Sequence, residues 1–220
     1  MWMDNWVLNL PKKFWSQVKS DIQGALPIRF RFFESQSNVV VLANSNKAES
    51  EVNKELCQKD IIPILKRKGG GVTVVLTRGC LILTFAAYMK ELYNNKEYFH
   101  LINSLWIEAL ESKGIQGLEE RGISDIVYKG KKLCGTSLFR KRNLLVYQGS
   151  LLVHPDLEFI SRYLKHPTRE PDYRKKREHL SFMTSLQEMG YSQSCDDLKV
   201  HCENFFHTYI EKKMGSHLLV

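Results

Sequence analysis

The sequence of 220 residues lacks any long apolar run. Its longest apolar stretch, residues 80–89, is about half of the roughly 20 residues that a membrane-spanning helix needs. The first residues include Asp4 and contain no apolar core before a small-residue cleavage site, so they do not resemble a signal peptide. These absences favour a cytoplasmic protein that has no membrane partner.

The sequence also lacks paired cysteines. Its five cysteines are an odd number, and none belongs to a Cys-x-x-Cys pair. This pattern argues against both a disulfide framework and a zinc site, and it suits a reducing compartment. We therefore expect no metal site built by the protein itself.

Acidic residues are missing from two windows of the chain. Residues 61–90 and 126–155 contain no Asp or Glu, and they hold five and six Lys or Arg residues respectively. Because the whole chain carries a formal net charge of +8, the rest of it sums to −3. An excess confined to two windows indicates a local site for an anionic ligand. A nucleic-acid binder is an alternative, but no stacking platform or recognition helix accompanies the basic residues.

Hydrophobic periodicity predicts strands in mixed order with helices between and after them. A helix is expected from Pro11, with residues 14, 18 and 22 on its apolar face, and Ser50 is expected to cap a short helix. Further helices are expected at residues 97–113, 155–165, 180–189 and 194–214. Strands are expected at residues 28–33 and 38–43, as a hairpin, and at 61–65, 72–76, 81–85, 125–128, 131–139 and 143–153. The fold class is therefore α+β or mixed α/β, with one main sheet and no linker that divides the chain.

The first acid-free window combines basic residues with a glycine triplet. Lys66, Arg67 and Lys68 precede three consecutive glycines, residues 69–71, which lie between two β-rich runs. Adjacent glycines let the backbone approach a ligand and point several N–H groups at one anion. The alternative is a flexible hairpin loop with solvated lysines. The loop is not a Walker A motif, which needs Gly-Lys-Ser/Thr, nor a dinucleotide fingerprint, which needs Gly-x-Gly-x-x-Gly.

The second window places lysines on a predicted strand. Residues 125–137 read DIVYKGKKLCGTS, so Lys131 and Lys132 follow a tight turn at Lys129-Gly130. A lysine held on a strand beside bound anions is a compact charge that can stabilise a reacting oxygen. The alternative is a hairpin edge on which lysines discourage aggregation.

In order and separation, the two windows resemble the lipoate–protein ligase family of the biotin/lipoyl ligase superfamily. The family pattern is an Arg-Arg-x-Ser/Thr-Gly-Gly-Gly loop, then Asn-Asp, then Gly-x-Lys-Ile/Val-Ser/Ala-Gly, then His-Gly-Thr-Leu-Leu. The similar segments here are residues 66–71, 124–125, 130–135 and 148–152, and Glu-Val-Asn at 51–53 resembles the family's Glu-x-Asn. The resemblance implies a biotin/lipoyl ligase-like catalytic domain with a central mixed or antiparallel sheet flanked by helices. It implies one such domain over residues 1–220, mainly helical from about residue 155, with no full C-terminal accessory domain.

The resemblance also implies an activity. Family members use ATP with Mg²⁺ to adenylate lipoate or octanoate, and then pass the acyl group to a lysine of an acceptor domain, without a permanent cofactor. The implied acceptors are the lipoyl domains of 2-oxoacid dehydrogenase E2 subunits or the H protein of glycine cleavage. A separate accessory subunit is a further partner that such a short chain could need.

The resemblance implies a role for each matching residue. Lys132 falls on the family's catalytic lysine, which contacts both the carboxyl group of the acid and the α-phosphate. The implied ATP-binding residues are Lys66, Arg67, Val72, Thr73, Val74, Val75, Asp125 and Lys132. The implied lipoate-binding residues are Gly70, Gly71, Lys132, Gly135 and Gln148.

The sequence departs from the family pattern at several positions. Lys66 replaces the first arginine of the pair, Val72 follows the loop glycines, and Gln148 replaces the histidine before the last glycine. These departures bear on how lipoate is positioned, and they leave two other functions open. One is an ATP-independent octanoyl or lipoyl transferase on the same fold, and the other is a non-catalytic lipoyl-binding subunit.

Several other residues have simpler interpretations. Cys134, next to Leu133 in the lysine motif, is expected to be a small buried filler rather than a nucleophile. The basic run at residues 173–177, within a polar stretch at 165–179, is expected to be a solvated loop at the rim where an acidic acceptor docks. Structural roles are expected for His100, His201 and His207.

Overall fold

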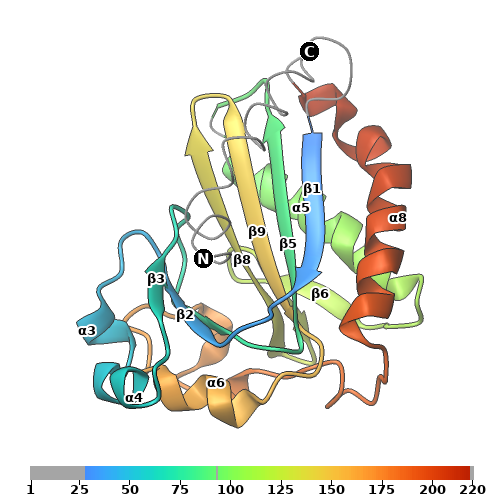
Figure 1. The fold of residues 1–220 in the computed structure, drawn as a ribbon. Helices are drawn as coiled ribbons and strands as arrows, with labels where there is room; N and C mark the ends of the chain where they lie inside the picture. The colour runs from blue at the N-terminus through green and yellow to red at the C-terminus, as the bar shows by residue number, and fades with distance from the viewer. Residues whose placement is uncertain (1–27, 93, 219–220) are drawn as a thin grey trace.

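The computed structural model describes residues 28–92 and 94–218, which form two β-sheets with helices around them (Figure 1). The helix predicted from Pro11 lies outside these residues. The predicted α+β class is confirmed, since an antiparallel sheet is flanked by helices.

Six strands form the larger sheet, in the order β1-β5-β9-β8-β7-β6, with every neighbouring pair antiparallel. These strands are β1 Ile28–Glu34, β5 Cys80–Tyr88, β6 Leu118–Arg121, β7 Asp125–Tyr128, β8 Lys131–Lys141 and β9 Leu144–Leu152. All of them except β6 were predicted. The sequence of β6 gives no strand signal because only Leu118 among its four residues is apolar.

The central strand β5 accounts for the longest apolar run of the sequence. Leu81, Leu83 and Phe85 belong to the core on one side of the sheet, and Cys80 and Ile82 belong to the core on the other side. A strand that is covered on both faces needs apolar residues at successive positions rather than at alternate ones.

A smaller sheet of three strands packs on the face of the larger sheet to which Cys80 and Ile82 belong (Figure 1). Its strands are β2 Val39–Leu42, β3 Ile64–Lys66 and β4 Val74–Leu76, in the order β3-β2-β4. The predicted hairpin between residues 28–33 and 38–43 is wrong, because β1 pairs with β5 while β2 pairs with β3 and β4. All four residues of β2 are buried, which suits a central strand, whereas the alternating β1 suits a sheet edge.

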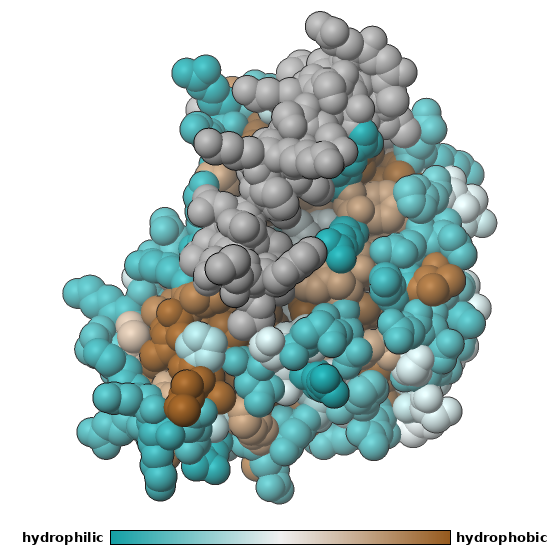
Figure 2. All heavy atoms as spheres, viewed as in Figure 1, coloured by the Kyte–Doolittle hydropathy of each residue, from teal (hydrophilic) through white to brown (hydrophobic). Residues whose placement is uncertain are grey.

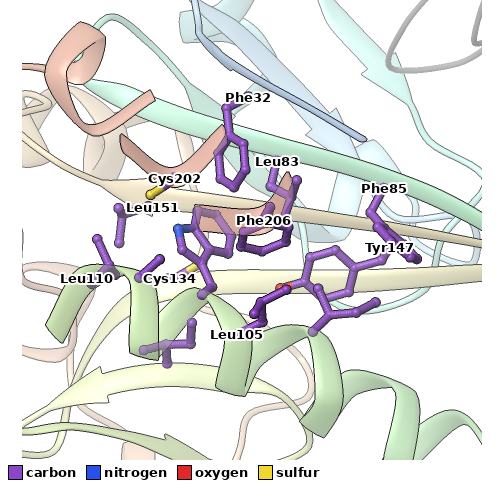
Figure 3. Close-up of a cluster of buried hydrophobic side chains, with 14 of the residues drawn as sticks. Phe32, Leu83, Phe85, Leu105, Leu110, Cys134, Tyr147, Leu151, Cys202 and Phe206 are labelled. Carbon is purple, nitrogen blue, oxygen red and sulfur yellow. The ribbon is translucent and has the colours of Figure 1, made fainter. Parts of the chain in front are cut away.

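Two long helices, α5 Asn95–Glu111 and α8 Cys195–Met214, cover the opposite face of the larger sheet (Figure 1). Both helices were predicted, and the hydroxyl of Ser194 caps α8 by accepting from the Asp197 N–H. Aromatic side chains fill the space between helices and sheet, with the Phe32 and Phe206 ring centroids 5.0 Å apart (Figure 3). A Cβ at position 149 would lie 2.4 Å from the Trp106 ring, so glycine in β9 makes room for that ring.

Short helices surround the smaller sheet. They are α3 Ala48–Glu51, α4 Lys54–Lys59, α6 Leu157–Tyr163 and α7 His179–Phe182, with 3₁₀ turns η2 Asp172–Arg174 and η3 Gly215–His217 elsewhere. Ser50 was predicted as a cap but lies inside α3, and Asn53 caps α4 instead. The helix predicted at 180–189 ends at Phe182, because Met183 bridges to β8 and the Thr184 N–H donates to the Lys132 carbonyl at 2.9 Å.

The face of the molecule in Figure 2 is mostly hydrophilic, and apolar residues gather over the smaller sheet. Within residues 28–92 and 94–218, no helix has the length and apolar character needed to cross a membrane.

The turn between β4 and β5 gives a test of the packing. Gly79 has a φ of +83°, and a Cβ there would lie 2.5 Å from the His154 carbonyl carbon. We expect Gly79→Ala to lower the free energy of unfolding by about 3 kcal/mol, since left-handed strain and displacement of packed backbone add. Urea denaturation would measure this loss.

Gly190→Ala is the matched control. Gly190 has a φ of +90°, but a Cβ added there would meet no atom within 4 Å, so only the strain of about 1–2 kcal/mol is expected. Equal losses in the two variants would show that the contact with His154 does not constrain this corner.

Candidate functional site

Two pockets meet at the start of β8. The first, which we call the intersheet pocket, encloses about 500 Å³ of empty space, open solvent at its mouth included, and is lined from β2, β4, β5, β8 and β9. The second, which we call the loop pocket, encloses about 790 Å³ on the same measure and is lined from α3, β4, α6, α7 and the segment between α6 and η2. Residues of both linings are Val72, Val74, Lys132, Gly135 and Ser150. Molecules bound in the two pockets would therefore meet beside Lys132.

Local backbone geometry fixes Lys132 at this junction. Lys129 and Gly130 both have positive φ, at 46° and 73°, as a two-residue type I′ hairpin turn requires, so the predicted tight turn is confirmed. The lysine side chain lies over Gly135, where a Cβ would be 2.9 Å from its Cε. Glycine at this position leaves space for the lysine stem.

An ion pair holds the amine of Lys132. Its Nζ lies 2.7 Å from Oδ1 of Asp125, and the two side chains are only 15% and 14% exposed. The other oxygen of this carboxylate, Oδ2, accepts a hydrogen bond of 2.8 Å from the Tyr173 hydroxyl. Both oxygens of Asp125 are therefore engaged, one by the lysine and one by the tyrosine.

Hydrogen bonds from the core position the residue before Asp125. The Ser124 carbonyl accepts from the Asn103 amide at 3.0 Å and from the Thr136 hydroxyl at 2.8 Å. Asn103 is fully buried on α5 and accepts in turn from the Tyr147 hydroxyl at 2.7 Å. The helix layer thus fixes the strand start from which Asp125 reaches Lys132.

Arg67 braces the glycine loop. Its buried guanidinium donates to the carbonyls of Val41, Gly70 and Val72 at 3.3, 2.7 and 2.8 Å. Burial lowers the pKa of this arginine to about 10, so it is still charged at neutral pH. Its two terminal nitrogens donate to protein carbonyls, whereas its Nε is buried without a hydrogen-bond partner among the described residues, and Arg67 forms part of the intersheet pocket wall.

Most of the other residues implied by the resemblance line the pockets. Gln148 lines the intersheet pocket, Thr73 and Val75 line the loop pocket, and Val72, Val74 and Gly135 line both. Four residues are absent from both linings, namely Lys66, Gly70, Gly71 and Asp125. The side chain of Lys66 is exposed, and Gly70 acts through its carbonyl on Arg67.

The prediction of a solvated loop at residues 173–177 is wrong for most of the run. Arg174 is buried, contacts Glu170 and lies 4.6 Å from the Phe182 ring centroid. Arg177 donates to the Gly130 carbonyl at 2.8 Å, which ties the segment to the β7–β8 turn. Only Lys175 and Lys176 of this run are exposed. Partners outside the run, on α7 and at the β7–β8 turn, account for much of this burial, and no local pattern signals them.

Residues 165–174 supply most of the cationic residues that line the loop pocket. This contribution was not predicted from the sequence. The cationic lining residues are Lys132, Lys165, Arg169 and Arg174, His179 lines the pocket beside them, and Glu51 is the acidic lining residue within the described chain. Burial lowers the pKa of His179, so this ring is neutral at pH 7, and it contacts the Lys165 carbonyl. Arg169, between Pro167 and Pro171, was the available signal in the sequence.

The five cysteines are all buried. Burial raises the pKa of Cys134, as was expected of a filler, and it also raises the pKa of Cys80, Cys195 and Cys202. Within the residues that the structure describes, Glu34, His154 and Cys195 bring possible metal-ligand atoms within 4.8 Å of one another, away from both pocket linings. Glu34 there already accepts from the Gly79 N–H at 2.7 Å.

The brace made by Arg67 can be tested by substitution. Arg67→Lys keeps the charge but cannot serve three carbonyls in fork geometry, so buried acceptors lose their partners. We expect the free energy of unfolding to fall by about 2–3 kcal/mol, measured by urea denaturation. Lys66→Arg, at the exposed neighbour, is the control and should change it by less than about 0.5 kcal/mol. An Arg67→Lys protein as stable as the wild type would show that the glycine loop does not depend on the guanidinium of Arg67.

Solved structures with a similar fold are lipoate–protein ligases. A structure described as a bi-partite lipoate protein ligase and its E2 lipoyl domain, from Thermoplasma acidophilum, has a TM-score of 0.73 at 19% identity, over 84% of this chain and 71% of that chain. A lipoate-protein ligase A bound with ATP has a TM-score of 0.73 at 18% identity, over 84% and 73%. Another Thermoplasma acidophilum structure, with bound lipoic acid, has a TM-score of 0.71 at 18% identity, over 84% and 73%. At these identities the likenesses show a shared fold.

The curated relatives with similar sequences include lipoate–protein ligases and an octanoyltransferase. The lipoate-protein ligase A of Blochmanniella floridana is 24% identical over 198 residues, which is 84% of this chain and 56% of that protein. The octanoyltransferase LipM of Oceanobacillus iheyensis is 21% identical over 199 residues, 80% of this chain and 71% of that protein. The ligases among these relatives are longer, and the matches cover 36% to 56% of their lengths. Since the model of the lipoyl protein ligase A/B catalytic domain matches residues 8–207, this chain belongs to that family.

Proposed function

We propose that this chain activates lipoate, or octanoate, with ATP and passes the acyl group to a lysine of an acceptor lipoyl domain. The observation that carries the proposal is the position of Lys132, which lines both pockets. A reaction that joins an acid to a nucleotide needs a cation at the point where the two anions come together.

The chemistry of each pocket supports one substrate. Val41, Leu76 and Ile82 give the intersheet pocket apolar walls that suit an acyl chain. The loop pocket is lined by several basic residues, namely Lys132, Lys165, Arg169 and Arg174, which suits the phosphates of a nucleotide. The family relatives include proteins whose structures hold ATP or lipoic acid.

The reaction balances as an adenylation followed by a transfer. A carboxylate oxygen of the acid attacks the α-phosphorus of ATP, the bond to the bridging oxygen breaks, and pyrophosphate leaves. Lys132 would offset repulsion between the two anions and stabilise charge on the phosphoryl oxygens. The acceptor amine then attacks the acyl carbon, AMP leaves, and an amide forms. Mg²⁺ would enter with the nucleotide as part of the substrate.

The ATP-independent transferase is the rival function, because one relative is an octanoyltransferase. A transfer through a cysteine needs a reactive thiolate, which partial exposure and a lowered pKa provide. The five thiols here are buried, and burial raises the pKa of each of them. This environment favours the adenylate route over a thioester route.

The proposal also covers the extent of the catalytic unit, its location in the cell and its acceptor proteins. We take residues 1–220 as one catalytic unit in the cytoplasm, acting on lipoyl domains of E2 subunits or on the H protein of glycine cleavage. One structural relative is described together with an E2 lipoyl domain, which supports an acceptor of this class. If the chain binds lipoate but catalyses neither adenylation nor transfer, its function is that of a non-catalytic lipoyl-binding subunit.

Exchange of labelled pyrophosphate into ATP tests the first step. The wild-type chain should show exchange that depends on lipoate or octanoate, and Lys132→Ala should reduce it by about 10²–10³-fold, because one transition-state cation is lost. Lys131→Ala is the control, since Lys131 lies on the same strand but outside both pocket linings. Absence of exchange in the wild type with acids of every chain length would refute adenylation.

The space over Gly135 gives a second test. Gly135→Ala puts a Cβ where Lys132 now lies, so the lysine end must move, which is cheap because that side chain is flexible. We expect exchange to slow by about tenfold while the free energy of unfolding changes by less than about 1 kcal/mol. Both would be measured on the same preparation. Full exchange activity would show that the amine needs no fixed position.

A further inference from the structure

We propose that Tyr173 is a positioning residue that acts on Lys132 through Asp125. The inference rests on the proposed function, because it assigns Tyr173 a part in the same reaction. Three groups lie in a chain: the Tyr173 hydroxyl donates to Oδ2 of Asp125 at 2.8 Å, and Oδ1 of Asp125 lies 2.7 Å from Nζ of Lys132.

The tyrosine can serve only as a donor here. Burial and the adjacent Asp125 charge raise the pKa of Tyr173 far above its ordinary value, so the hydroxyl keeps its proton. Since an ionised carboxylate offers only acceptors, the bond between them has one direction. Tyr173 thereby occupies one oxygen of Asp125 and leaves the other for the lysine.

Several contacts fix the tyrosine itself. It lies in η2, and its ring packs on Phe182 with centroids 5.2 Å apart. A Cβ at Gly122, whose φ is +64°, would lie 3.4 Å from the ring, so the β6–β7 turn closes against it. The Tyr173 carbonyl accepts from Arg177 at 2.9 Å, and the same guanidinium donates to the Gly130 carbonyl. The hydroxyl is thus held in place from the two turns that flank β7.

The arrangement sets how much of the lysine charge is available to a substrate. If Tyr173 did not hold Oδ2, the carboxylate could turn and offer both oxygens to Lys132. A tighter ion pair would compete more strongly with an incoming carboxylate or phosphate for the amine. Arg169 and Arg174 of the same segment line the loop pocket, so the tyrosine also links that wall to the lysine.

Tyr173→Phe removes only the hydroxyl and is the test variant. We expect kcat for pyrophosphate exchange to fall by about tenfold while KM for ATP changes less than twofold. A loosened segment would instead raise KM, because its residues form the pocket wall. In an Asp125→Asn background, Tyr173→Phe should have no further effect on kcat; additive effects would overturn the inference, since they would mean that Tyr173 does not act through Asp125.

The chain offers a matched control in a second tyrosine–carboxylate–cation group. The Tyr163 hydroxyl donates to Oδ2 of Asp60 at 2.8 Å, and Arg162 binds the same carboxylate at 2.9 Å, outside both pocket linings. Tyr163→Phe should leave kcat for exchange unchanged. An equal loss of kcat in this control would overturn the inference by showing a general effect of losing a buried hydroxyl bond.

A measurement independent of catalysis separates this inference from the proposed function. The rate at which acetic anhydride acetylates Lys132, followed by mass spectrometry, should fall several-fold in Tyr173→Phe and stay unchanged in Tyr163→Phe. If the wild type shows no exchange but this reactivity falls, adenylation is wrong and the positioning role stands. If exchange is present but the reactivity is unchanged in Tyr173→Phe, the positioning role is overturned and adenylation stands.

Discussion

The contact between Lys132 and Asp125 is the constraint on which the rest of the site depends. A lysine removed from water needs a carboxylate beside it, because desolvation otherwise disfavours the charged amine. The pair lies 2.7 Å apart with both side chains mostly buried. It keeps a positive charge between an apolar pocket and a basic one, and an anion that binds there competes with Asp125 for the amine. The pair is therefore both the resting arrangement of the structure and the contact that an anion bound to Lys132 would have to loosen.

The two-layered fold explains how such a pair stays in place. Because β5 is buried on both faces, the larger sheet can pack against helices on one side and enclose a pocket on the other. The helix side is dense, as the approach of Trp106 to Gly149 shows, and a polar branch on that side runs through Asn103 to the Ser124 carbonyl. The position of Asp125 is thus set by the core, while the position of Lys132 is set by a two-residue turn and by Gly135.

The sequence predicted those features that depend on interactions between residues close together in the chain. The strand at 125–128, the turn at Lys129-Gly130 and helix α8 were all visible, because alternation, turn chemistry and capping act over a few residues. The pairing of β1, the burial of Arg174 and the partial burial of Tyr173 were not visible. In both cases a partner lies on another element, β5 for the strand, and Asp125 or Phe182 for the two side chains. The motif residues predicted from the sequence include those at the junction of the two pockets. The basic wall of the loop pocket comes largely from residues 165–174, which the sequence did not identify as part of a pocket.

The departures from the family pattern differ in consequence because they fall on different parts of this arrangement. Lys66 is exposed, whereas Arg67 donates to the Gly70 and Val72 carbonyls of the glycine loop, so the lost first arginine does not weaken the brace. Val72 serves that brace through its carbonyl, which any residue offers. Gln148 is different, since it is a half-buried residue of the intersheet pocket, which Val41, Leu76 and Ile82 also line. An amide offers two N–H donors and an acceptor oxygen, where a neutral imidazole offers one donor and one acceptor, and a polar group in a pocket discriminates against ligands that leave it unpaired. Selection among acids should therefore depend on Gln148 more than on the altered glycine loop.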